Sequence, residues 1–510
     1  MEKQRFYITT AISYPNGNPH IGHAYEAITA DVIARSQRRN HLRDVRLCTG
    51  TDEHGLKMVQ TARDNAMTPQ GLASMKAALF QKMNDDLHVG YDRFIRTSSP
   101  EHHETAQKLW RRMSADLYLD KYTGWYSVRD EAYFDESELT RSDDGLYFTD
   151  TGNPVEWIEE ESWFFRLTDY RDRLKQHFAD NPDFLRPESS RNEILAMLDD
   201  LRDISVSRTT FDWGVPVPDS PGHVMYVWVD ALANYLTGAT SENENHWWPA
   251  DLHVIGKDIA KFHAIYWPAF LMSANLALPK QIFCHGHLRH NGARMSKSAG
   301  NVVDPFVVLN TVPGDALRYY LCAETVFGKD GDFIDTRLVE RYNNDLANGL
   351  GNLISRTSTL VAKLERLPAV EPPRPCDQEL LALVSQITAI EVPAAFDRLD
   401  LSGAVREWMK AVNACNAFIQ ERQPWNKANH ELDNERTLST LWRAIGALVY
   451  AIEPVIPDTA KRIIDFMKVP TMAQSGNDSW YRWLAVRKDM NGNPAEYIPT
   501  KAPAFFPRIG

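Results

Sequence analysis

Two short motifs in this sequence combine residue types that suit phosphate binding. His20-Ile21-Gly22-His23 follows an apolar run and a Pro-Asn-Gly-Asn turn. Histidines three positions apart lie on one face of a helix, and the free N–H groups at a helix start attract anions. Gly22 has no side chain, so a nucleotide base can lie against the backbone there. Four residues are weak evidence alone, and two surface histidines at a helix start are the alternative.

The second motif is Arg294-Met295-Ser296-Lys297-Ser298, followed by Ala-Gly-Asn. It alternates two cations with two hydroxyls on a short loop. Such a loop can surround a triphosphate and neutralise the charge that develops as pyrophosphate leaves. An ordinary solvated basic loop is the alternative.

Alternating strands and helices must position these motifs. The apolar run 6–12 predicts a buried strand, with Asn18 as N-cap and Pro19 as first residue of a helix. Residues 45–49 predict a second strand. This order is typical of a βαβ unit and therefore of a parallel sheet.

The alternation resumes near residue 250. Strands are predicted at 252–256 and 282–288, with a helix between them over 260–274 in which Pro268 is expected to introduce a kink. Both motifs follow predicted strands, at the carboxyl edge where open α/β sheets bind ligands. Beyond about residue 335, apolar residues at helical spacing from Leu338 to Leu364 predict one long amphipathic helix, and further helices follow to about 470.

The composition excludes several classes of protein. The 510 residues are 43% apolar and 24% charged, which is typical of a globular chain and not of a disordered one. The net charge of −12 argues against a protein that coats nucleic acid. Five scattered cysteines form no CxxC pair, which argues against a disulfide framework. We expect a cytoplasmic protein, with no membrane association because no run of 18 apolar residues occurs.

Taken together, the two motifs resemble the HIGH and KMSKS signatures of class I aminoacyl-tRNA synthetases. The first match is literal. In the second, Arg294 stands where the class usually has Lys, and Lys297 is retained. Arginine keeps the charge but differs in reach and geometry.

Further blocks resemble the methionyl-tRNA synthetase family over about residues 5–470. They are the segments 11–17, 50–55, 227–232 and 255–263. The resemblance implies that Asp52 pairs with the ammonium group of methionine. It also implies that the methionine pocket is lined by Ala11, Ile12, Tyr14, Trp228, Ala231, Leu232, Tyr235 and His263. A metal bound by Asp52, Glu53 and His54 is the less favoured alternative, since sequence neighbours rarely converge on one ion.

The resemblance also implies roles in catalysis and in reading tRNA. His20, His23, Arg294 and Lys297 would stabilise the transition state. ATP would be bound by Gly22, Glu26, Gly256, Asp258, Ser296, Lys297 and Ser298. Asn352 and Arg356, four positions apart on one helix, would read a CAU anticodon with Trp425. Without the resemblance, these three residues would be assigned to a solvated helix face and a core cap.

We therefore expect an α/β protein with four parts: a Rossmann-type catalytic domain (1–114 and 216–335), an inserted connective domain (115–215), a helical anticodon-binding domain (336–470) and a tail (471–510). The insertion contains no cysteine, so no structural zinc is expected, and its core would use aromatic residues such as Trp125, Trp157 and Trp163.

The expected activity is that of a methionine–tRNA ligase. The enzyme would activate methionine with Mg-ATP and transfer it to the terminal adenosine of initiator and elongator methionine tRNA. A monomer is expected, because about 40 residues after the helical region are too few for a further domain. The alternatives are a nucleotidyltransferase that acts on small molecules and an inactive tRNA-binding protein.

Overall fold

The computed structural model describes residues 4–127, 132–134, 136–142, 144–150, 152–240, 247–296, 300–364, 373–468 and 500–509. They fall into two compact units. Unit 1 comprises Met1–Ala30, Arg43–Asp85 and Val89–His287, and unit 2 comprises Asp31–Leu42, Asp86–His88 and Leu288–Gly510.

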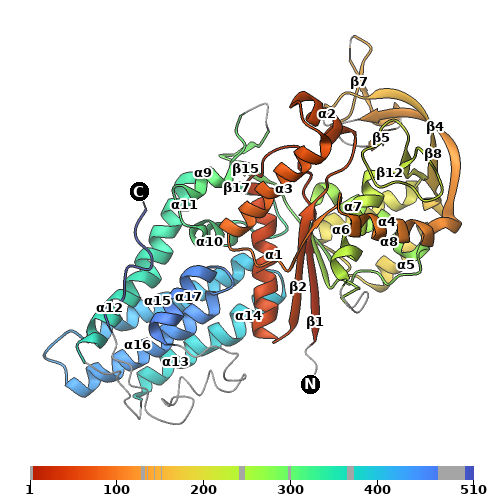
Figure 1. Ribbon diagram of the computed structural model, residues 1–510. Coiled ribbons are helices and arrows are strands. Elements are labelled where there is room, and N and C mark those ends of the chain that lie inside the picture. The colour runs from red at the N-terminus through yellow and green to blue at the C-terminus, as the bar shows by residue number, and fades with distance from the viewer. Residues whose placement is uncertain are drawn as a thin grey trace. The chain divides into compact units, whose positions relative to one another are not determined.

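A six-stranded, wholly parallel sheet forms the centre of unit 1 (Figure 1). In spatial order its strands are β3 (Arg93–Arg96), β2 (Asp44–Thr51), β1 (Arg5–Thr10), β13 (Leu252–Gly256), β14 (Ile282–His285) and β9 (Leu185–Arg186). The predicted strands are confirmed, within a few residues at their ends. The chain runs outward from β1 through β2 to β3 and later continues on the other side with β13. This reversal between β1 and β13 is the switch point where open α/β sheets bind ligands.

Helices of unit 1 connect and cover these strands. They are α1 (Ile21–Asn40, whose first ten residues belong to unit 1), α2 (Leu56–Asp64), α3 (Pro69–Asp86), α4 (Pro100–Met113), α5 (Arg171–Asp180), α6 (Glu188–Met197), α7 (Val227–Ala239) and α8 (Trp267–Ser273). A π-helical turn, Phe262–Tyr266, precedes α8. Pro268 lies in the first turn of α8, directly after the π-helical turn, where its missing N–H is tolerated; residues 260–273 are helical without a break, and the kink stays a prediction.

The start of α1 differs from the prediction. The helix begins at Ile21, because imidazoles rather than Asn18 cap its first turn. The N–H of His20 donates to Nδ1 of His23 and that of Gly22 donates to Nδ1 of His20, both at 3.1 Å. The side-chain oxygen of Asn18 instead accepts a 2.7 Å hydrogen bond from Lys76.

The insertion contains a four-stranded antiparallel sheet. Its strands, in spatial order, are β10 (Ile204–Ser205), β8 (Glu156–Phe165), β4 (Leu117–Ser127) and β5 (Ala132–Phe134). Short hairpins pair β6 (Thr140–Arg141) with β7 (Tyr147–Phe148) and β11 (Ser207–Arg208) with β12 (Val224–Met225). Trp163 packs against the core. Trp157 does not: it is 58% exposed, although it lies six residues before Trp163 and therefore on the same face of β8, and its ring meets that of Trp125 edge-on.

Unit 2 combines a small sheet with stacked helices. The sheet contains β15 (Leu288–His290), β16 (Ala293–Arg294) and β17 (Gly331–Phe333). The helices are α9 (Pro305–Leu309), α10 (Gly314–Glu324), α11 (Asp335–Arg341), α12 (Asn352–Ala362), α13 (Pro375–Gln386), α14 (Val392–Asp397), α15 (Leu401–Arg422), α16 (Glu431–Ile452) and α17 (Pro457–Met467). Figure 1 shows α15, α16 and α17 side by side. A π-helical segment, Tyr342–Gly351, joins α11 to α12, so the predicted long helix is continuous but locally widened.

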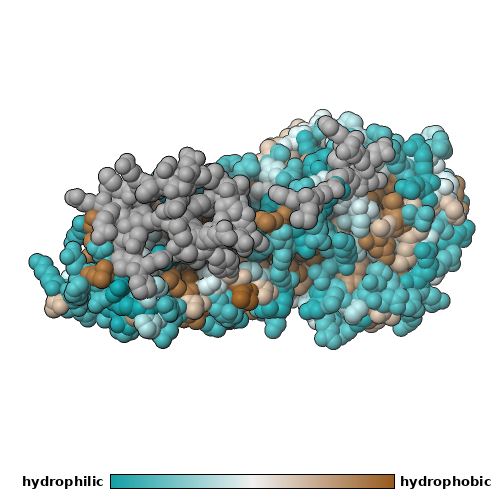
Figure 2. Space-filling view, turned by 90° about the horizontal axis from the view of Figure 1, so that it is seen from below, coloured by the Kyte–Doolittle hydropathy of each residue, from teal (hydrophilic) through white to brown (hydrophobic). Residues whose placement is uncertain are grey.

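One stretch of unit 2, Pro375–Asp397, is long and apolar enough to cross a membrane by length and composition alone. Its side chains Leu380, Val384, Ile387 and Phe396 are buried against neighbouring helices. Leu383 and Ile390 on the same stretch are exposed, so one face of it is buried and the other is not. On the face seen in Figure 2, hydrophilic residues cover most of the described surface and apolar residues form separate patches.

Candidate active site

The two histidines of the first motif stack on each other at the start of α1. Their ring centroids are 3.7 Å apart, and the ring planes are 20° from parallel. Since each ring accepts a backbone hydrogen bond at Nδ1, each neutral ring carries its hydrogen on Nε2. A Cβ on Gly22 would lie 3.0 Å from the His20 ring, so glycine allows this ring to fold over the first turn.

The expected free N–H groups at this helix start are not available as predicted. Those of His20 and Gly22 donate to imidazoles, and those of His23 and Ala24 donate to the carbonyl of His20. The imidazole Nε2–H groups therefore replace backbone N–H groups as the donors suited to phosphate oxygens.

Glu26, one turn further along α1, pairs with a residue that the sequence motifs did not identify. Its carboxylate lies 2.9 Å from Nε2 of His285, at the carboxyl end of β14. The other ring nitrogen, Nδ1, donates to the carbonyl of Gly286. Burial alone lowers the pKa of His285, but the Glu26 carboxylate raises it overall.

Gly256 and Asp258 lie together at the end of β13. A Cβ on Gly256 would come within 2.7 Å of the Asp258 carboxylate, so the glycine allows this side chain to turn back toward the strand. Asp258 also lies 3.5 Å from His287. The sheet thus brings Glu26, Gly256, Asp258 and two unpredicted histidines to its carboxyl edge.

Residues of α7 and of the π-helical turn before α8 form an aromatic cluster where the methionine pocket was predicted, and this cluster is called the aromatic pocket below. Trp228 and Phe262 stack face to face, with ring centroids 3.7 Å apart and planes 7° apart. The ring of His263 meets that of Trp228 edge-on at 6.0 Å. The hydroxyl of Tyr235 lies 2.6 Å from Nε2 of His263. Phe262 was not predicted, although its place beside His263 in the sequence is a usable signal.

Other predicted pocket residues are distributed around this group. Ala11 and Leu232 belong to the same hydrophobic cluster as Trp228 and Tyr235. Ala231 is buried on α7, and Ile12 is half-buried after β1. Tyr14 packs against a different cluster formed by α2 and α3.

Asp52 is buried directly after β2, where its N–H donates to the carbonyl of Ser13. The neighbouring acidic and imidazole side chains diverge. Glu53 binds Arg96 at 2.7 and 3.0 Å, and His54 binds Asp230 at 2.6 Å. No group of three metal-ligating side chains gathers among the residues that the structure describes. This divergence argues against the metal alternative.

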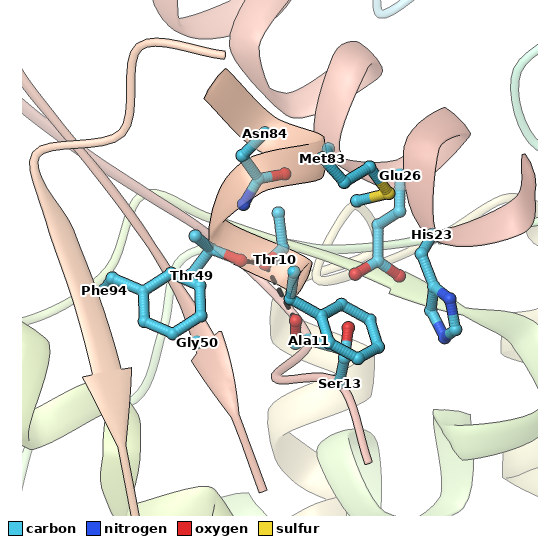
Figure 3. Close-up of a pocket in the computed structure, with 12 residues that line it drawn as sticks. Thr10, Ala11, Ser13, His23, Glu26, Thr49, Gly50, Met83, Asn84 and Phe94 are labelled. Atoms are coloured by element: carbon cyan, nitrogen blue, oxygen red, sulfur yellow. Dashed lines mark hydrogen bonds between the residues drawn. The ribbon is translucent and has the colours of Figure 1, made fainter. Parts of the chain in front are cut away.

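A small cavity in unit 1 adjoins the histidine motif. Figure 3 shows His23 and Glu26 on one side of it and Thr49 and Phe94 on the other. Of the methionine-pocket candidates, Ala11 alone lines it. The cavity therefore lies beside α1 and is distinct from the aromatic pocket.

The second motif lies in unit 2, after the β15–β16 hairpin. Arg294 is exposed in β16, and Ser296 follows it. Asn301 joins the two, because its side-chain oxygen accepts from the N–H of Ser296 at 2.8 Å and its amide donates to the carbonyl of Arg294 at 3.0 Å. Lys297 and Ser298 lie outside the described residues.

The three anticodon candidates also lie in unit 2. Asn352 and Arg356 share α12, as predicted. The guanidinium of Arg356 lies 4.8 Å from the centre of the Trp425 ring and donates to Gln420. Trp425 follows α15 and is 42% exposed, so it is not a core residue.

A parallel sheet with an HxGH motif at its switch point, together with a basic Ser-rich loop, defines a class I aminoacyl-tRNA synthetase. Comparison with known proteins specifies the family. The model for "tRNA synthetases class I (M)" matches residues 6–142 and 148–358. The chain belongs to this family.

Its relatives are similar over almost their whole length. The chain is 47% identical to methionine–tRNA ligase of Mycobacterium tuberculosis over 99% of the chain and 98% of that protein, and 46% identical to that of Rhizobium meliloti over 91% and 92%. It is also similar to the solved structure of the Mycobacterium tuberculosis methionyl-tRNA synthetase in complex with methionyl-adenylate. There the TM-score is 0.91 and the identity 44%, over 99% of this chain and all of that one.

Proposed function

We propose that the chain is a methionine–tRNA ligase. It forms methionyl-adenylate and pyrophosphate from methionine and Mg-ATP, and then transfers methionine to the terminal adenosine of methionine tRNA. The observation that carries the proposal is near full-length similarity to enzymes of this name and to a methionyl-adenylate complex, in a chain whose Trp228 and Phe262 stack face to face. The catalytic domain, connective insertion, helical anticodon domain and tail remain the domain division that we propose.

In the activation step, the methionine carboxylate attacks the α-phosphate of ATP. His20 and His23 would donate from Nε2 to phosphate oxygens as negative charge moves onto them. Lys297, with Arg294 and the two serines, would stabilise the departing pyrophosphate. Glu26, Gly256 and Asp258 would bind the adenosine, and Gly22, which allows the His20 ring to fold over the first turn of α1, would contribute to the same ATP site. Positioning and electrostatic stabilisation suffice, so no covalent enzyme intermediate is needed.

Methionine would bind in the aromatic pocket. A thioether is polarisable and favours aromatic edges and faces, which the Trp228–Phe262 stack supplies. Tyr235 and His263 close the apolar end as a hydrogen-bonded pair. The buried Asp52 carboxylate would pair with the ammonium group.

Transfer requires recognition of the tRNA. The exposed Trp425 ring would stack on an unpaired anticodon base, and Asn352 and Arg356 would bind base edges. The resemblance to the family implies CAU as the anticodon, and we propose it on that ground. We also propose that the enzyme acts as a cytoplasmic monomer that needs no structural zinc.

The test is ATP–pyrophosphate exchange with each of the twenty amino acids, without tRNA. Exchange with methionine alone supports the proposal, and exchange with another amino acid overturns the specificity. If no exchange occurs, charging of tRNA with a CAU anticodon separates an inactive scaffold from an enzyme that needs tRNA first. Full activity in a strong zinc chelator supports the zinc-free proposal, whereas inactivation that zinc reverses contradicts it.

A further inference from the structure

Helix α7 presents two faces with different functions. Trp228, Leu232 and Tyr235 recur at helical spacing and form one face, which contributes to the aromatic pocket. Asp230 and Thr237 lie on the other face, toward α4, which packs against α7 (Figure 1). The position of the face that carries Trp228 and Tyr235 therefore depends on the contacts that fix the opposite face against α4.

The buried carboxylate of Asp230 fixes the face of α7 that lies toward α4. Both oxygens of Asp230 are hydrogen-bonded: Oδ2 to Nδ1 of His54 at 2.6 Å, and Oδ1 to Nε2 of His102 at 2.7 Å. The other nitrogen of His102 lies 3.0 Å from the hydroxyl of Thr237. Asp230 and His102 are fully buried, and His54 is nearly so. Burial by itself raises the pKa of Asp230, but the two histidines lower it overall, so the carboxylate is ionised.

The same carboxylate also fixes the segment that carries Asp52. His54 lies two residues after Asp52, and its ring meets that of Trp213 edge-on at 5.1 Å. The indole N–H of Trp213 donates to the carbonyl of Glu53 at 2.6 Å. Glu53 in turn is paired with Arg96. The other titratable group near the cluster is His103, whose ring lies 5.3 Å from that of His54.

We propose that Asp230 is a positioning residue of the amino-acid site. Through His54 it holds Asp52, and through His102 it fixes α7, so that the carboxylate that pairs with the ammonium group and the aromatic wall keep one spacing. This inference rests on the proposed function, because it takes methionine as the ligand of this pocket. Asp230 contacts no reacting atom and acts through its neighbours.

Two substitutions of Asp230 distinguish the effect of its hydrogen bonds from the effect of its negative charge. Asparagine at position 230 offers one acceptor for the N–H of His54 and one donor for His102. His102 can then accept at Nε2 and donate from Nδ1 to Thr237, whose own hydroxyl can donate to the carbonyl of Ala233. Asp230→Asn therefore keeps every partner, whereas Asp230→Ala removes both bonds.

The experiment measures KM for methionine and for ATP in pyrophosphate exchange. In Asp230→Ala we expect KM for methionine to rise at least tenfold and KM for ATP to stay within twofold. In Asp230→Asn we expect both to stay within threefold. Asp203→Ala is the matched control, because Asp203 also accepts from two side chains, Tyr118 and Thr168, within the insertion.

Several results would overturn the inference. They are an equal rise in both KM values in Asp230→Ala, a rise in Asp203→Ala of the same size, and impairment of Asp230→Asn equal to that of Asp230→Ala. If Asp230→Ala does not fold, a second pair of variants decides. His54→Asn keeps a donor near the Nδ1 position and should stay within threefold, whereas His54→Leu should raise KM for methionine at least fivefold. An unchanged KM for methionine in His54→Leu overturns the inference.

If the unmodified enzyme shows neither exchange with methionine nor charging of CAU tRNA, the proposed function fails instead.

Discussion

The hydroxyl of Tyr235 donates to Nε2 of His263 across 2.6 Å inside the aromatic pocket. The direction follows from the other ring nitrogen, because Nδ1 of His263 faces the carbonyl of Ile259 at 2.9 Å and must donate to it. Burial lowers the pKa of His263 to about 4, so the ring is neutral near pH 7. A neutral, hydrogen-bonded pair suits a thioether better than a charged one.

This depressed pKa predicts a loss of stability in mild acid. Between pH 6.5 and about 4 the unfolded chain protonates His263 and the folded chain does not. The free energy of unfolding is unaffected by protonation of this residue above pH 6.5. As the pH is lowered from 6.5 to 4, it decreases by about 3 kcal/mol. In urea unfolding, the free energy of unfolding should therefore differ less between pH 4.5 and pH 7 for His263→Asn than for the unmodified chain. His41→Asn, at the surface, serves as control; equal pH dependence in all three proteins contradicts the assignment.

Tyr235→Phe should weaken methionine binding selectively. It removes a buried hydrogen bond worth about 1–1.5 kcal/mol and leaves Nε2 of His263 without its donor. We expect KM for methionine to rise about five- to tenfold in pyrophosphate exchange, with KM for ATP unchanged. Tyr170→Phe loses a comparable bond to Asp116 in the insertion and should change neither value. An equal rise in KM for ATP would show that the hydroxyl supports the fold rather than the pocket.

Lys297→Ala should slow adenylate formation while leaving methionine affinity intact. Removing one charge that stabilises the transition state costs about 3–4 kcal/mol, so we expect the exchange rate to fall about 100- to 1,000-fold. Methionine binding by calorimetry should stay within twofold. Lys329→Ala, an exposed lysine next to β17, controls for loss of charge. Loss of methionine binding with a normal exchange rate would show that the loop has another role.

Trp425→Ala should separate tRNA charging from amino-acid activation. Stacking on one base is worth about 1–3 kcal/mol, so charging of CAU tRNA at limiting concentration should fall about tenfold or more while exchange is unchanged. Leu432→Ala, also an exposed apolar residue of unit 2, should charge normally. A similar loss in both assays would assign Trp425 a structural role.

The sequence alone determined the parallel sheet, the positions of its main strands and the resemblance to class I synthetases. These are local properties: apolar runs fix the strands, and the motifs are contiguous residues. Trp228, Tyr235 and His263 were also predicted, from blocks of neighbouring residues.

Only the tertiary structure decided which distant residues meet. Glu26 and His285 are 259 positions apart, and Asp230 joins His54 to His102 across 176 and 128 positions. No local pattern encodes such pairs, because they depend on how the strands order themselves in the sheet and on how α4 packs against α7. The same reason explains the failures. Asn18 was expected to cap α1 but binds Lys76 instead, and Trp157 was expected in a core but is 58% exposed. In the first case the helix was predicted within two residues, whereas the strand that carries Trp157 was not predicted, and in both cases the surroundings of the side chain were set by long-range packing.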